Sequence, residues 1–130
     1  MIFLDTDVVI DLLDGDQATV ALLRRLQAEG EDVALTTVNV AELLRGEDAP
    51  AGPRYRETVA RLLAASEAFA LDEAAARRFG VLMSQLDRAG KRIPEVDGLI
   101  ASVVLENGGR LVTRNRKHFE RVPGLDIVSP

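Results

Sequence analysis

Three acidic residues at distant positions of the sequence stand beside apolar segments, where a charge is costly unless it has a partner. Asp5 ends a short apolar run, Glu42 lies in a turn of otherwise apolar residues, and Asp97 borders a helical apolar stripe. Carboxylates that gather within a few ångströms raise one another's pKa values, and a divalent cation relieves that repulsion. A few oxygen ligands, with water and phosphate completing the shell, favour Mg2+ or Mn2+ over zinc or copper.

Such an ion would supply hydrolytic chemistry that the rest of the composition lacks. It can lower the pKa of a bound water and offset charge on a phosphodiester transition state. The chain has no cysteine and one histidine, His118. These counts exclude thiolate sites, a multi-histidine zinc site and the histidine acid/base pair of a metal-free ribonuclease. Metal-dependent phosphodiester hydrolysis is therefore the predicted reaction.

Each acid also has a structural interpretation. Glu42 could close a capping box with Asn39 as the N-cap, and Asp97 could be a favourable charge near the start of a helix. Asp7 could be an ordinary N-cap. Asp5 is the hardest to explain structurally, because it ends an apolar strand where no cap is required.

Basic residues gather near the C-terminus of this acidic chain, whose formal net charge is -5. They predict a basic strip that holds phosphate beside the metal, with a solvated loop as the alternative. His118 is interpreted as part of this strip or of the surface rather than as a metal ligand, while Thr6 and Thr113 could orient ligands or water. The strip consists of Arg110, Arg114, Arg116, Lys117 and Arg121, around Asn115.

Composition limits the class of protein that carries these residues. A chain of 130 residues with 47% hydrophobic residues can bury one core, and it has no apolar stretch long enough for a membrane span. The apolar start is interrupted at Asp5 and has no basic segment before it, so we expect no cleaved signal peptide. The absence of cysteine favours a reducing cytoplasm.

The elements that must position these side chains alternate along the chain. Short apolar runs predict strands, and apolar residues spaced three and four positions apart predict helices between them. We expect Asp7 to cap the first helix and Pro94 to lie in the first turn of the last one. We interpret Glu47 to Pro53 as a surface loop. The predicted strands are Ile2 to Leu4, Val33 to Thr36, Ala68 to Leu71, Leu111 to Thr113 and Asp126 to Val128; the predicted helices begin near Asp7, Asp16, Asn39, Tyr55, Asp72 and Pro94.

Alternating strands and helices indicate an α/β protein with a parallel sheet covered by helices on both faces. Ligands of such sheets bind beyond the carboxyl ends of the strands. The acids that follow the strands, together with Asn115, could therefore converge on one edge.

The motifs carry a resemblance. FLDTDVVIDLL, TTVNVAELLRG and IPEVDGLIASVVLENGGRLVTRNRKHFERVPGL resemble, in order, the motifs of PIN-domain ribonucleases, specifically of VapC-type toxins from toxin-antitoxin pairs. The resemblance spans nearly the whole chain and implies a single domain over 1–130. Its fold would be three-layered, α/β/α, with a small central parallel sheet of about four to five strands.

The resemblance also implies the site and the partners. Asp5, Glu42 and Asp97 would be the acidic triad that binds Mg2+ or Mn2+. Asn115 and His118 stand where the family often has a fourth acid, which bears on whether a second metal binds. The implied partners are an RNA substrate (tRNA, rRNA or mRNA), a cognate VapB-like antitoxin and a second copy of the chain in a homodimer.

Two other functions fit parts of the sequence. A phosphatase of the haloacid dehalogenase type would use Asp5 as nucleophile and Asp7 as acid/base, but it needs a later lysine and an acidic pair. Lys91 and Lys117 are the only lysines, and no acidic doublet follows Leu111. A non-catalytic PIN-like module that binds a protein partner is the third possibility, supported by the missing fourth acid.

Overall fold

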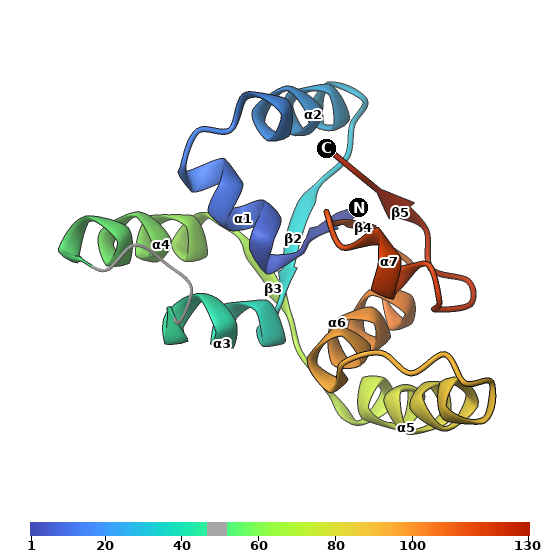
Figure 1. Ribbon diagram of the computed structural model, residues 1–130. Coiled ribbons are helices and arrows are strands. Elements are labelled where there is room, and N and C mark those ends of the chain that lie inside the picture. Colours follow the sequence, from blue (N-terminus) through green and yellow to red (C-terminus); the bar gives the residue numbers. More distant parts are fainter. Residues whose placement is uncertain (47–51) are drawn as a thin grey trace.

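A parallel sheet forms the centre of the computed structural model, which describes residues 1–46 and 52–130 (Figure 1). Within these residues the sheet has five strands in the order β3-β2-β1-β4-β5, and all four pairings are parallel. The predicted parallel α/β fold is therefore confirmed. The strands are β1 (Ile2–Leu4), β2 (Val33–Thr36), β3 (Glu67–Phe69), β4 (Arg110–Val112) and β5 (Ile127–Val128).

Helices cover both faces of the sheet, which gives the three-layer architecture visible in Figure 1. Four helices pack with one apolar cluster and three with the other. The first group is α1 (Thr6–Leu13), α2 (Gln17–Ala28), α3 (Thr37–Arg45) and α4 (Pro53–Ala65); the second is α5 (Glu73–Arg88), α6 (Glu95–Glu106) and α7 (Arg116–Phe119).

The two-residue period of the central strand divides the core. In β1, Ile2 and Leu4 contribute to the cluster under α1 to α4, whereas Phe3 contributes to the cluster under α5 to α7. All three side chains are fully buried. A strand that is apolar on both faces belongs at the centre of a parallel sheet, because helices exclude water from both sides.

The helix starts differ from the predictions at two positions that matter for the site. Asp7 does not cap α1; the N-cap is Asp5, whose side chain accepts a hydrogen bond from the Thr6 amide. The predicted capping box of Asn39 and Glu42 is also wrong, because Thr36 is the N-cap of α3 and Asn39 is its third helical residue. The helix α3 begins directly at the end of β2, and Asp5 alone separates β1 from α1.

Other boundaries agree to within a few residues. The helices α2 and α5 begin near Asp16 and Asp72 as predicted, with these two residues as their N-caps, while Pro94 lies at the N-cap of α6 rather than in its first turn. The predicted loop from Glu47 falls outside the described residues over 47–51, and Pro53 already begins α4. None of the helices in the described ranges is both long and apolar enough to cross a membrane.

Candidate active site

Asp5 lies at the carboxyl end of β1, and both of its carboxylate oxygens are held by hydrogen bonds. The Thr6 amide donates to Oδ1 at 2.9 Å, and the Thr113 hydroxyl, which follows the neighbouring strand β4, donates to Oδ2 at 2.7 Å. The residue is 6% exposed. Desolvation outweighs these bonds and raises the Asp5 pKa from 3.8 to about 6, with repulsion from Asp7 and Asp97 adding to the rise. Asp5 is therefore a fixed carboxylate that a nearby cation would stabilise.

Glu42 projects from α3 and is oriented through α1. The Thr6 hydroxyl donates to Glu42 Oε1 at 2.7 Å and accepts a hydrogen bond from the Asn39 amide group at 3.0 Å. Asn39 in turn accepts a hydrogen bond of 2.6 Å from the Thr36 hydroxyl at the N-cap. This relay connects the end of β2 with the start of α1 and fixes one oxygen of Glu42.

Asp97 lies in the first turn of α6, which leads back to β4. Its Oδ2 is 2.8 Å from His118 Nδ1 and 3.5 Å from Asn115 Nδ2. Burial raises the pKa of Asp97, the contact with His118 opposes that rise, and repulsion from Asp7 adds to it. The C-terminal segment thus supplies neutral and basic partners to this acid.

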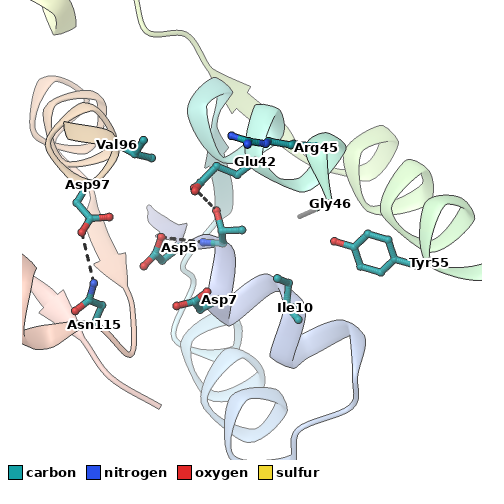
Figure 2. A pocket seen from close by; sticks show the side chains of 11 residues that line it. Asp5, Asp7, Ile10, Glu42, Arg45, Gly46, Tyr55, Val96, Asp97 and Asn115 are labelled. Carbon is teal, nitrogen blue, oxygen red and sulfur yellow. Dashed lines mark hydrogen bonds between the residues drawn. The ribbon is translucent and has the colours of Figure 1, made fainter. Parts of the chain in front are cut away.

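A pocket of about 190 Å³ brings the predicted site residues together (Figure 2). Asp5 and Asp7 lie on one side of it, and Asp97 and Asn115 face them from the other. Glu42 borders it from α3. The convergence predicted from the ends of the strands is thus present, and Asp7, which is exposed, also lines the pocket.

The donor set suits a hard divalent cation. Within residues 1–46 and 52–130, no three histidine or acidic side chains stand close enough together to form a ready-made metal cage. The carboxylates and the Asn115 amide instead border a shared hollow, and Mg2+ binds through few side chains while keeping several waters. Burial raises the pKa of Asp5, so a cation bound beside it would favour its charged form. On these grounds the residues fit such a cation.

The predicted substrate-binding residues divide into two groups. Thr6 and Thr113 hold Glu42 and Asp5 respectively, so their hydroxyls orient possible metal ligands. Arg116 and Lys117 are exposed at the start of α7.

The basic strip is not one continuous free surface. Arg114 bonds Asp11 and reaches Asp16 at 2.8 Å, which ties the loop after β4 to α1 and to the start of α2. Arg110 pairs with Glu31 at 2.7 Å, and Arg121 donates to a backbone carbonyl. Sequence proximity alone did not reveal these acidic partners, because they come from distant segments.

Sequence reasoning missed three features of the pocket. Arg45 lines it from the last turn of α3, three residues after Glu42, a helical spacing that could have indicated a shared face. Tyr55 is predicted only as the start of a helix, but it lines the pocket, and its buried hydroxyl has no hydrogen-bond partner among the described residues. His118 was assigned to the basic strip, whereas its ring contacts Asp97.

The fold and the acidic pocket define a class of protein. Residues 2–125 match the PIN domain, and the chain belongs to the PIN-domain family. Within that family it is of the VapC type: it is 33% identical to "Ribonuclease VapC19" of Mycobacterium tuberculosis, over 96% of this chain and 97% of that protein. It is also 28% identical to "tRNA(fMet)-specific endonuclease VapC" of Shigella flexneri, over 94% of this chain and 92% of that protein.

A solved structure supports the same assignment. The crystal structure of VapBC2 from Rickettsia felis, bound to a DNA fragment from their promoter, contains a chain that superposes with a TM-score of 0.87 at 26% identity. The match covers 100% of this chain and 99% of that one. The resemblance inferred from the sequence motifs is confirmed. The phosphatase alternative has no support in the site, because neither Lys91 nor Lys117 lines the pocket.

Proposed function

We propose that this chain is a metal-dependent endoribonuclease and the toxin of a VapBC-type toxin-antitoxin pair. The observation that carries the proposal is the meeting of Asp5, Glu42 and Asp97 in one pocket of a PIN-domain chain. The ribonuclease and endonuclease names of its VapC relatives support RNA as the substrate class.

Asp5, Glu42 and Asp97 would hold Mg2+, with Mn2+ as a substitute, and Asn115 would assist through its amide. The bound cation would lower the pKa of a water and offset charge on the scissile phosphate. Thr113 and Thr6 keep Asp5 and Glu42 in place, so little reorganisation is needed when RNA arrives. Arg116 and Lys117 would attract the RNA backbone from the rim.

The proposed partners and setting follow from the same membership. They are an RNA substrate (tRNA, rRNA or mRNA), a VapB-like antitoxin that silences the site, and a second copy of the chain in a homodimer, all in the cytoplasm. The structures of VapBC2 from Rickettsia felis and of the chain's other VapBC neighbours support an antitoxin partner. We also propose that residues 1–130 act as one domain.

Carboxamide variants of the site test the proposal. Asp5→Asn and Asp97→Asn should each lower cleavage of structured RNA in Mg2+ by more than about a hundredfold, because each removes a charged metal ligand while keeping the side-chain shape. Asp7→Asn is the matched control: it is exposed, receives no hydrogen bond from the elements of the site, and should lose much less activity. Circular dichroism would verify the fold of each variant.

The same assay separates the remaining alternative. A non-catalytic module that only binds a protein partner would leave RNA intact in every metal tested. If Asp5→Asn and Asp97→Asn cleaved RNA as fast as the wild type, the proposed site would be contradicted.

A further inference from the structure

His118 is the one histidine of the chain, and its ring contacts Asp97 and Asn115, two residues that line the acidic pocket. It lies in α7 and its side chain is 35% exposed. Its Nδ1 is 2.8 Å from Asp97 Oδ2 and 2.7 Å from Asn115 Nδ2, and these two atoms are 3.5 Å apart. Three polar atoms from two separate elements therefore form a small triangle.

With the Asn115 amide nitrogen turned toward His118, hydrogen bonds do not satisfy this triangle. Nδ1 carries either a proton or a lone pair, so it cannot donate to the Asp97 carboxylate and also accept from the Asn115 amide. Whichever form is present leaves one close contact without a hydrogen between the two atoms. Turning the Asn115 amide by half a rotation places its oxygen, which is a metal donor, at the same corner.

The triangle then has the dimensions of neighbouring ligands on one ion. Ligands about 2.0 to 2.2 Å from an octahedral ion lie roughly 3 Å from one another. The observed separations of 2.7, 2.8 and 3.5 Å lie around that value. One carboxylate oxygen, one amide oxygen and one imidazole nitrogen would be the donors.

We infer that His118 Nδ1 is a direct metal ligand, sharing a divalent cation with Asp97 and Asn115, and that it strengthens the binding of transition-metal ions such as Mn2+ more than that of Mg2+. The inference builds on the proposed function, since it adds a nitrogen donor to the same pocket. Mg2+ is a hard ion that takes oxygen ligands, whereas imidazole suits first-row transition metals. The nitrogen donor of His118 would therefore change the relative affinities of the centre for these ions.

The single histidine makes a direct test unambiguous. Mn2+ bound to tag-free protein would be examined by pulsed electron paramagnetic resonance, which detects a directly coordinated imidazole nitrogen. We expect a nitrogen coupling in the wild type and its loss in His118→Gln. No other side chain of the sequence carries an imidazole that could give this signal.

Affinities for the metals alone provide the second measurement. His118→Gln should weaken Mn2+ binding by about tenfold or more, as loss of one ligand contact does, and weaken Mg2+ binding by less than about twofold. His118→Asp, which restores an oxygen donor, should instead strengthen Mg2+ binding relative to Mn2+. The control is Glu120→Gln, an exposed change two residues away, which should leave both affinities within about twofold.

Failure of this inference differs from failure of the proposed function. If Mn2+ binds without a nitrogen coupling, or with equal affinity in wild type and His118→Gln, His118 is only a hydrogen-bond partner of Asp97. The ribonuclease proposal would survive that result if the wild type still cut RNA. A nitrogen coupling in a protein that cuts no RNA would support the ligand and overturn the nuclease.

Discussion

Asp5 shows how one residue can serve the fold and the site at once. It is the N-cap of α1, and it is also a buried carboxylate bonded by Thr113 from the neighbouring strand connection. A helix cap needs only an oxygen that accepts a hydrogen bond. A buried carboxylate also needs a compensating partner, because moving its charge out of water costs several kcal/mol otherwise. The stability cost of Asp5 in the metal-free protein is therefore a measurable sign of its role.

The pH dependence of stability should reveal this cost. Because the Asp5 pKa is raised to about 6, the native state retains a proton between about pH 4 and pH 6 that the unfolded chain has released. The contribution of Asp5 to stability is thus largest below that window and falls as pH rises through it. A rise of about 2 units, at 1.36 kcal/mol each, gives a loss of about 3 kcal/mol by pH 7.

Urea unfolding in a chelator, from pH 4 to pH 7, measures this prediction. Asp5→Asn should flatten most of the slope, and the raised pKa of Asp97 should leave a smaller slope of the same sign. Asp126→Asn, at an exposed position, should keep the wild-type curve. A metal-free protein whose stability rises from pH 4 to pH 7 would contradict the burial argument.

At the scale of elements, the cap of α3 orients Glu42. Asn39 is fully buried; it accepts from the Thr36 hydroxyl and donates to the Thr6 hydroxyl, which in turn donates to Glu42. The strand-to-helix junction and the site therefore share one hydrogen-bond chain. Damage to this junction should change function as well as stability.

Asn39→Ala should cost about 2 kcal/mol of unfolding free energy, because it removes half of a capping box and leaves buried groups unpaired. It should also weaken metal binding by about tenfold through the misplaced Glu42. The matched control is Asp72→Ala, which removes the N-cap of α5 far along the chain and should cost about 1 kcal/mol without changing metal affinity. Equal metal affinities in the two variants would argue against the relay.

The basic residues in and before α7 have two different roles: some form ion pairs within the fold, and others are exposed where RNA could bind. Arg114 is engaged by Asp11 and Asp16, whereas Arg116 and Lys117 are exposed. A side chain that already has acidic partners releases fewer counterions on binding a phosphate than an unengaged one. The three cations should therefore differ in an RNA titration.

Arg116→Gln combined with Lys117→Gln should lower the slope of log affinity against log salt by about 1.4, at roughly 0.7 per phosphate contact on single-stranded RNA. Arg114→Gln should change that slope by less than about 0.5. Binding would be measured in an Asp97→Asn background, so that the RNA stays intact. A larger slope change for Arg114→Gln would return that residue to the binding surface.

At the scale of the whole molecule, the two helical layers depend on close packing around the central strand. Gly109, between α6 and β4, lies directly against the Phe3 ring, and an added Cβ would come within 2.5 Å of it. Phe3 is fully buried and forms an edge-on contact with Phe69 at 5.2 Å between ring centroids. The ring has little room to move, so Gly109 provides the space that Phe3 occupies.

Gly109→Ala should therefore destabilise the protein by about 2 kcal/mol, the cost of overpacking a well-filled core. Gly80→Ala is the matched control. Gly80 lies inside α5 with open space around its position, and alanine there should stabilise the protein by about 1 kcal/mol. Denaturant midpoints at constant m-value would measure both changes, and effects of the same sign would contradict the packing argument.

The sequence by itself determined the layers, the strand positions and the family. Runs such as Ile2–Leu4 are apolar at every position, a pattern that suits a strand buried on both faces, and the motifs around Asp5, Glu42 and Asp97 carried the membership. The apolar runs and the motifs both depend on residues that are close together in the sequence, so the sequence alone is enough to recognise them. The helix caps were predicted less well, because any of several adjacent polar residues could fill the same local role.

Only the tertiary structure decided which side chains meet. Thr113 bonds Asp5 across 108 positions, Arg114 bonds Asp11 across 103, and His118 contacts Asp97 across 21. Such pairs depend on strand order, since β4 lies beside β1 although most of the chain separates them. Local patterns carry no information about that order, because closing a long loop is decided by the packing of the whole core rather than by the residues at its ends.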